Sequence, residues 1–277
     1  GRAWRVFNGE IYNFKALRDD WQRRGHVFKS ATDSETILHG YEVWGDDVVH
    51  HLDGMFAFAI WDREKRRLLL ARDPFGIKPL HYAALPGGGI AFASEIKALL
   101  KISSIPRRLN LTGLGLFLTF AQVPAPHTIY ESICKLPPGH RLVADGSGQR
   151  IDPYYRLPTE RWNNPSPEAM AERVRERLNE AVKTHLVADV PVGCALSGGL
   201  DSGLIAALAT ERVGRIQTFS AVFPDVPAMN EDRYQRLVAH HLGSDHHVIE
   251  DRMDLLAKLR VMLDVTDEPF AISSFLP

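Results

Sequence analysis

The sequence predicts two successive domains, an α+β domain with antiparallel strands and then an α/β domain with a parallel sheet. In the first half, short apolar runs are joined by short turns, which favours antiparallel pairing. In the second half, strands and helices alternate, which is typical of a parallel sheet. A stretch rich in proline and glycine, Lys135–Pro167, separates the two patterns and reads as irregular. We expect domains at 1–160 and 161–277.

The first half is expected to contain two helices among its strands. Helical spacing begins after Asn13, a plausible cap, and stops at Gly25, and a second helix covers Ser34–Trp44. The apolar runs that read as strands are Trp4–Phe7, Met55–Trp61, Leu68–Ala71, Leu80–Leu85 and Ile90–Ser94.

The second half is expected to open with a helix that Ser166 and Pro167 cap and start. Three strands then alternate with three helices. The strands are Val192–Leu196, Ile216–Phe223 and His246–Glu250, and the helices are Leu200–Thr210, Glu231–Leu242 and Met253–Leu263.

Composition excludes several classes of protein. The chain has 277 residues with 33 Lys+Arg against 34 Asp+Glu, a net charge of −1, so no basic field suggests a nucleic-acid partner. Cys134 and Cys194 are its only cysteines, too few for a disulfide framework or a cysteine zinc site. No apolar run reaches the roughly 18 residues that cross a bilayer. We expect a cytoplasmic protein that binds small molecules, and we interpret both ends as cut from a longer chain.

The strongest motif is Ser197-Gly198-Gly199-Leu200-Asp201-Ser202, between a predicted strand and a predicted helix. The two glycines would let the backbone approach a phosphate, and the N–H groups of the helix start would face it. The two serine hydroxyls can donate further hydrogen bonds. A carboxylate beside a phosphate implies a cation between them, so Asp201 suggests Mg²⁺. A plain glycine turn with a Ser/Asp cap is the alternative.

This motif resembles the pyrophosphate loop of the ATP pyrophosphatases, and the whole chain resembles the family of glutamine-hydrolysing asparagine synthetases. The resemblance implies an αββα N-terminal-nucleophile glutaminase-like domain, followed by an α/β parallel-sheet ATP-pyrophosphatase domain of the adenine nucleotide alpha-hydrolase-like type. It implies ATP and Mg²⁺ as cofactors, with glutamine and aspartate as substrates. ATP would activate the aspartate side chain as an acyl-adenylate, and ammonia from glutamine would displace AMP.

The first-half motif Asn8-Gly9-Glu10-Ile11-Tyr12-Asn13, expected to follow the first strand, resembles that family's glutaminase motif. The resemblance implies that the Asn8 side-chain amide and the Gly9 backbone N–H form an oxyanion hole for amide hydrolysis. Glu10 would help to hold the glutamine, and Asp33 would pair with its α-ammonium group. A helix N-cap is an equally good interpretation of Asp33.

Other residues that match the family have no expected chemical role for their side chains. Ala195 and Ala221, at the ends of two strands, would contact adenine through their backbones and complete an ATP site with Ser197, Gly198, Gly199, Asp201 and Ser202. Arg72 and Asp73 lie in a segment similar to the family's Arg-Asp…Gly-x-x-Pro-Leu, and we interpret them as a buried ion pair.

The sequence also departs from the family. The nucleophile of the family is an N-terminal cysteine, whereas this chain begins at Gly1. We therefore expect that the parent enzyme is active and that this fragment alone is inactive. Three alternatives stay open. β-Lactam synthetases and lasso-peptide cyclases adenylate another carboxylate, polysaccharide-cluster amidotransferases use another acceptor, and a non-catalytic nucleotide-binding or regulatory protein would have kept only the fold. A homodimer is also left open.

Overall fold

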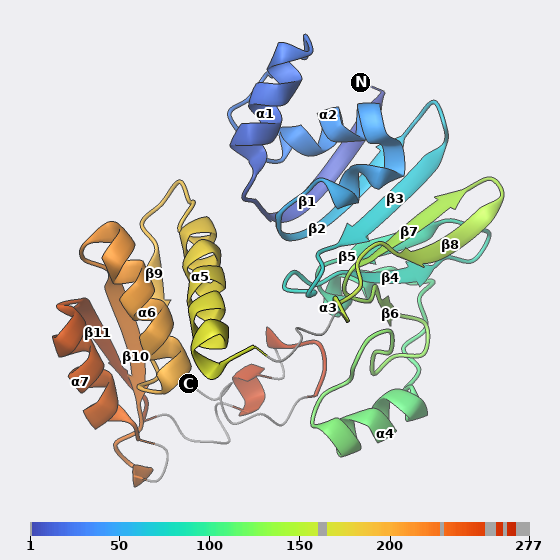
Figure 1. The fold of residues 1–277 in the computed structure, drawn as a ribbon. Helices are drawn as coiled ribbons and strands as arrows, with labels where there is room; N and C mark the ends of the chain where they lie inside the picture. Colours follow the sequence, from blue (N-terminus) through green and yellow to red (C-terminus); the bar gives the residue numbers. More distant parts are fainter. Residues whose placement is uncertain (1, 160–164, 228–229, 253–258, 263–264, 270–277) are drawn as a thin grey trace. The chain divides into compact units, whose positions relative to one another are not determined.

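A computed structural model describes residues 2–159, 165–227, 230–252, 259–262 and 265–269. The chain divides into two compact units (Figure 1). The first unit comprises Gly1–Pro158 with Val261–Ser273, and the second comprises Thr159–Arg260 with Ser274–Pro277. The division after Pro158 lies beside the boundary expected at 160. That the units are separate functional domains stays a prediction.

The first unit is built on two antiparallel sheets. The larger has the strand order β1-β2-β3-β7-β8 and the smaller the order β5-β4-β6. The strands of the larger sheet are β1 (Ala3–Ile11), β2 (Gly54–Asp62), β3 (Arg67–Arg72), β7 (His140–Asp145) and β8 (Gly148–Pro153). Those of the smaller sheet are β4 (His81–Ala84), β5 (Ile90–Ala93) and β6 (Cys134–Lys135).

Successive side chains of β2 point to opposite faces of the larger sheet, and this explains the layers of the unit. Phe56, Phe58 and Ile60 of β2 face the helical side, where they pack with α2 (Glu35–Trp44) and the short 3₁₀ helix η1 (Gly45–His50). Ala57 and Ala59, the intervening residues of β2, face the smaller sheet. The far side of that sheet is covered by α3 (Ile96–Leu99). The order helix, sheet, sheet, helix is the αββα arrangement that the sequence predicted.

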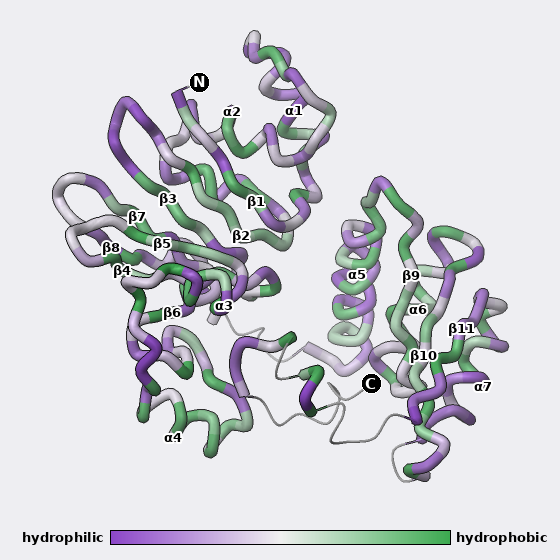
Figure 2. The backbone as a smooth tube through the Cα atoms, turned by 180° about the vertical axis from the view of Figure 1, so that it is seen from behind, coloured by the Kyte–Doolittle hydropathy of each residue, from purple (hydrophilic) through white to green (hydrophobic). Residues whose placement is uncertain are grey.

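Two further helices complete the first unit. α1 (Phe14–Arg23) packs on the helical side through Phe14 and Leu17. The sequence analysis did not predict α4 (Leu111–Phe120), whose N-cap Asn110 accepts a hydrogen bond from Gly113 N. Hydrophobic residues run along most of this helix (Figure 2), and Leu118 is 75% exposed. Because it has no polar face, helical periodicity could not reveal it.

The second unit is an α/β layer. Its described sheet has the parallel order β11-β10-β9, and helices connect consecutive strands. The strands are β9 (Gly193–Ala195), β10 (Gln217–Val222) and β11 (Asp245–Glu250), and the helices are α5 (Pro167–His185), α6 (Leu200–Val213) and α7 (Asp232–Leu242). The Ser166 side chain caps α5 by accepting from Ala169 N, as predicted. The predicted helix Met253–Leu263 lies largely outside the described residues.

Two predictions about the first unit were wrong. The stretch Lys135–Pro167 is not irregular throughout, because it contains the β7–β8 hairpin, whose Leu142 packs toward the smaller sheet and whose Val143 packs toward the helical side. The motif that starts at Asn8 does not follow the first strand, because β1 stays paired with β2 through Ile11. No described helix is long and apolar enough to cross a membrane.

Candidate functional site

The carboxyl end of β1 presents two residues of the first-half motif on one exposed face. Half-buried and exposed positions alternate along β1, so Asn8 and Glu10 are exposed, while Ile11 at its end is buried. Asn8 Nδ2 donates a hydrogen bond to Ser94 Oγ at 3.3 Å. An amide nitrogen carries two hydrogens, so the second remains available to a ligand.

Gly9 lies where the backbones of β1 and β2 come very close together. It pairs with Phe56, and its φ is +147°, which disfavours a side chain. A Cβ atom at this position would lie 2.1 Å from Met55 O and 2.7 Å from Phe56 Cα. Gly54 on the facing strand is equally confined, since a Cβ there would lie 2.1 Å from Glu10 O. The two glycines hold the end of β1 flat against β2.

Asp33 covers the free edge of β1 at the end of the motif. Its Oδ2 accepts from Ile11 N at 2.8 Å, and its Oδ1 accepts from Ser34 N at 2.6 Å. The helix-cap interpretation of Asp33 is wrong, because the N-cap of α2 is Ser34. Asp33 is bound to Ile11, in the strand that carries Asn8 and Glu10, as a shared glutamine site would require.

The loop that carries Asp33 is shaped by Glu35, the first residue of α2. Glu35 accepts from the backbone N–H groups of Lys29 at 2.7 Å and Ser30 at 2.8 Å, and also from the Ser30 hydroxyl. Burial favours a higher pKa for Glu35, but these hydrogen bonds outweigh it and lower the pKa to about 2. The loop is therefore tied to the helix by an ionised carboxylate.

Arg72 and Asp73 were predicted to form a buried ion pair, and instead each binds backbone groups. The Arg72 guanidinium donates to the carbonyl oxygens of Gly76, Lys78 and Leu136, each at 2.8 Å. Asp73 is fully buried and accepts from four backbone N–H groups, those of Phe56, Phe75, Ile77 and Lys78. Both residues organise the turn after β3, which favours a structural role.

In the second unit, the glycine-rich motif forms the turn between β9 and α6. Ser202 Oγ lies 2.9 Å from Ser197 Oγ, and the same oxygen accepts from Ser197 N at 3.1 Å. Ser197 Oγ accepts from Gly199 N, the N-cap of α6, at 3.3 Å. The two hydroxyls therefore close the loop around the start of the helix, where backbone N–H groups attract anions.

Gly198 brings this loop against α7. Its φ is +85°, and a Cβ atom would lie 3.0 Å from both Gln235 N and Tyr234 Cβ. Gln235 is 4% exposed, and its Nε2 donates to Ala221 O at 3.1 Å and lies 3.5 Å from Ser197 O. One buried amide thus joins the loop to the end of β10.

The remaining predicted nucleotide ligands surround this loop. Ala195 ends β9 and Ala221 lies near the end of β10, at the carboxyl edge of the parallel sheet. Asp201 is exposed in the first turn of α6. A cavity of about 530 Å³ between α5, β9 and α6 has Ala195 and Ser202 among its lining residues, and most of the others are apolar. The structure therefore places the predicted ATP ligands around one edge of the sheet.

Sequence reasoning missed three residues of these sites. Ser94 contacts Asn8, and His81 Nδ1 lies 3.0 Å from Ser94 O. Gln235 lies under the phosphate loop. Each is far along the chain from the residue that it contacts, so no local motif could have indicated it.

Two family models match this chain, one after the other. Residues 1–155 match the family model described as a glutamine amidotransferase domain, and residues 173–277 match the asparagine synthase model. Among solved structures, glutamine phosphoribosylpyrophosphate amidotransferase from B. subtilis aligns with 93% of this chain and 50% of its own, at 14% identity and a TM-score of 0.41.

The chain is also similar to curated proteins. The chain is 36% identical over 251 residues to glutamine-hydrolysing asparagine synthetase 3 of Bacillus subtilis, covering 88% of this chain and 40% of that protein. It is 37% identical over 281 residues to a putative glutamine-hydrolysing asparagine synthetase of Mycobacterium tuberculosis, covering 98% and 43%. The chain thus spans less than half of these relatives. It belongs to the glutamine amidotransferase family, and its match to the asparagine synthase model follows that domain in the sequence.

Proposed function

We propose that the whole protein amidates aspartate, using ATP and ammonia released from glutamine, with release of AMP and pyrophosphate. The observation that carries this proposal is the presence of a phosphate loop in a chain whose first unit ends β1 with an exposed Asn-Gly-Glu motif. An amide hydrolase alone would not need the phosphate loop. A nucleotide-binding protein alone would not need the glutaminase motif.

In the first unit, the proposed reaction is hydrolysis of the glutamine side-chain amide. Attack on the amide carbon places negative charge on its oxygen, and preorganised donors stabilise that charge. The Asn8 amide, held by Ser94, and the Gly9 N–H are the proposed donors. Asp33 offers a carboxylate to the α-ammonium group, and Glu10 lies on the same exposed face as Asn8.

In the second unit, the proposed ligand is ATP with Mg²⁺. Ser197, Ser202 and the N-terminal N–H groups of α6 would hold its phosphates, and Ala195 and Ala221 would contact the adenine through their backbones. Asp201 fits an ion that prefers carboxylate, phosphate and water oxygens, because its carboxylate is exposed in the first turn of the same helix. The bound ion would supply charge neutralisation at the phosphates.

The glutaminase assignment is tested in the full-length protein by two variants. Asn8→Ala should lower kcat for glutamine hydrolysis roughly 100-fold, as loss of an oxyanion donor does. Asp33→Asn should mainly raise KM for glutamine. Neither should change synthesis from free ammonium. Asp19→Asn, at an exposed position of α1, serves as the control. Unchanged glutamine hydrolysis in Asn8→Ala would contradict the assignment.

The nucleotide assignment is tested by aspartate-dependent exchange of pyrophosphate into ATP. Asp201→Asn should abolish the exchange, while Glu211→Gln, near the other end of α6, should leave it intact. Exchange supported by another carboxylic acid and not by aspartate would favour a related synthetase. Failure to bind ATP would indicate a protein that kept only the fold.

A further inference from the structure

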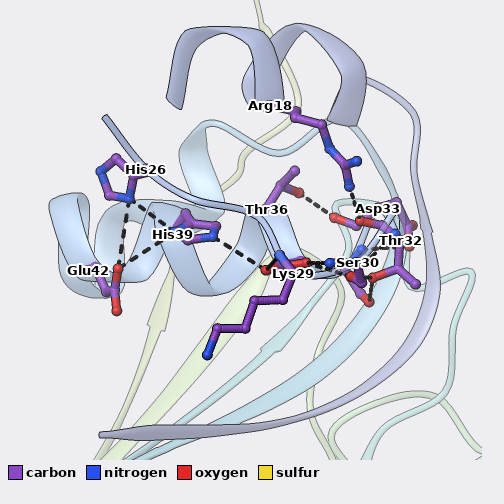
Figure 3. A network of polar contacts seen from close by, with 11 residues as sticks. Arg18, His26, Lys29, Ser30, Thr32, Asp33, Thr36, His39 and Glu42 are labelled. Atoms are coloured by element: carbon purple, nitrogen blue, oxygen red, sulfur yellow. Dashed lines mark hydrogen bonds and ion pairs between the residues drawn. The ribbon is translucent and has the colours of Figure 1, made fainter. Parts of the chain in front are cut away.

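Two histidines and one glutamate, His26, His39 and Glu42, lie close together in the first unit (Figure 3). His26 follows α1, and its backbone N–H donates to Trp21 O at 3.0 Å. His39 and Glu42 lie one turn apart on α2, so both point from the same side of that helix. The cluster therefore joins the segment after α1 to the body of α2. It shares no residue with either proposed substrate site.

The donor atoms of this cluster form a small triangle. His26 Nδ1 lies 3.0 Å from His39 Nδ1, and Glu42 Oε2 lies 3.9 Å from the first nitrogen and 3.7 Å from the second. Bonds to zinc of about 2.0–2.1 Å at tetrahedral angles place neighbouring ligand atoms about 3.3–3.4 Å apart. The observed distances bracket that value, so shifts of a few tenths of an ångström would accommodate an ion.

The hydrogen bond between the two imidazoles is also compatible with a metal site. Two Nδ1 atoms at 3.0 Å can form a hydrogen bond only if one of them carries a proton. If His26 donates, His39 is protonated at Nε2, which faces Glu35 Oε1 at 3.7 Å. A metal ion can replace the shared proton and accept both Nδ1 lone pairs. His39 Nε2–H then keeps its carboxylate neighbour, as metal-bound histidines usually do.

The surroundings hold both rings in place and leave a route for the ion. The Trp21 ring meets His26 edge-on at 5.1 Å, and the Phe28 ring lies 4.3 Å from His39. The side chains of His26 and His39 are only 21% and 14% exposed, whereas that of Glu42 is 48% exposed. Solvent therefore reaches the triangle from the glutamate side, where a water can complete four ligands.

We propose that His26, His39 and Glu42 bind one divalent transition-metal ion, with Zn²⁺ as the ion that suits two imidazoles and a carboxylate. Glu35 is the outer carboxylate that orients His39, and it also binds Lys29 and Ser30 of the loop before α2. Bound metal should therefore slow hydrogen exchange of these two amides. The metal site stands independently of the proposed glutamine-binding role of Asp33 in that same loop.

The primary test is competition for Zn²⁺ between a chromophoric chelator and the full chain. The wild-type chain should take up one ion per molecule. His26→Gln and His39→Gln should abolish that uptake, and Glu35→Gln should weaken it roughly 10- to 100-fold. His50→Gln is the matched control, because His50 also lies near a carboxylate three residues away, Asp47 at 3.9 Å. Equal uptake in His39→Gln and His50→Gln would overturn the proposal.

A second measurement uses only the wild-type chain and so does not depend on the variants folding. In protein labelled with ¹⁵N-histidine, Zn²⁺ should shift the Nδ1 resonances of two histidines while their Nε2 atoms stay protonated. Hydrogen exchange of the Lys29 and Ser30 amides should slow in the same sample. Coordination through Nε2, or no shift at either Nδ1, would overturn the proposal.

Discussion

At the scale of single residues, the first unit depends on positions where no side chain fits. Gly9 of β1 pairs with Phe56, and Gly54 of β2 pairs with Ile11. A Cβ atom on either glycine would lie 2.1 Å from a carbonyl oxygen of the other strand. Such an approach is closer than any non-bonded contact allows. The motif glycine is therefore required by the sheet itself, whether or not its N–H group also binds substrate.

Gly9→Ala should accordingly lower the free energy of unfolding by about 3 kcal/mol or more, because the strands must separate and the φ of +147° becomes strained. Urea unfolding of the chain measures this loss. Gly115→Ala is the control, since a Cβ there meets nothing within 4 Å in α4, and it should raise stability by up to about 1 kcal/mol. Equal effects of the two changes would contradict the close approach.

His81 predicts a pH dependence of stability. Its side chain is 8% exposed, and a ring nitrogen facing Ser94 O must donate, because a carbonyl oxygen only accepts. Burial, with Lys135 and Arg72 nearby, lowers the pKa of His81 from 6.5 to about 4. Between these values the unfolded chain binds more protons, so stability falls as pH decreases from 6.5 to 4.

The loss attributable to His81 should reach roughly 3 kcal/mol at pH 4, at 1.36 kcal/mol for each pKa unit. Denaturant unfolding at several pH values measures it. His81→Gln can still donate to the Ser94 carbonyl but cannot titrate, so its stability should depend less on pH over this range. The same slope in both proteins would show that other groups cause it.

At the scale of elements, the sequence predicted the helices and strands that have a periodic pattern. It did not predict features that depend on contacts between distant parts of the chain. Ser166 and the serines of the phosphate loop act within a few residues, so their roles could be read locally. The β7–β8 hairpin was missed because the glycines and prolines of this stretch suggested a loop. Pairing of β7 with β3 and burial of Leu142 between the two sheets make it a strand. The contact of Asn8 with Ser94 spans 86 positions and left no local signal.

α7 supports the glycine-rich loop that we propose binds the ATP phosphates. Gln235→Ala removes the hydrogen bond to Ala221 O and the support beneath Ser197. Losing one such bond costs about 0.5–1.5 kcal/mol, so binding of a non-hydrolysable ATP analogue should weaken roughly 2- to 10-fold. Calorimetric titration measures this. Gln217→Ala, at the exposed start of β10, should bind normally, and equal affinity in both variants would exclude the role of Gln235.

At the scale of the whole molecule, the first unit is not continuous in sequence. Residues 265–269 belong to it, although they follow β11 and lie in the region that matches the asparagine synthase family. Asp267 accepts from the N–H groups of Ile96 at 2.6 Å and Lys97 at 3.2 Å, at the start of α3. Sequence analysis placed the boundary by composition, which cannot reveal a segment that returns to an earlier unit.

Glu268 completes this attachment by accepting from Ile129 N at 2.8 Å and pairing with Lys135. The double variant Asp267→Ala/Glu268→Ala should therefore speed amide exchange at Ile96, Lys97 and Ile129, while exchange in the larger sheet stays slow. Hydrogen exchange followed by NMR resolves these amides individually. Glu250→Ala, which removes an exposed ion pair with Arg252 in the second unit, should leave all three unchanged. Unaltered exchange in the double variant would mean that the two carboxylates do not stabilise the first unit, and the returning segment would then be held by other contacts.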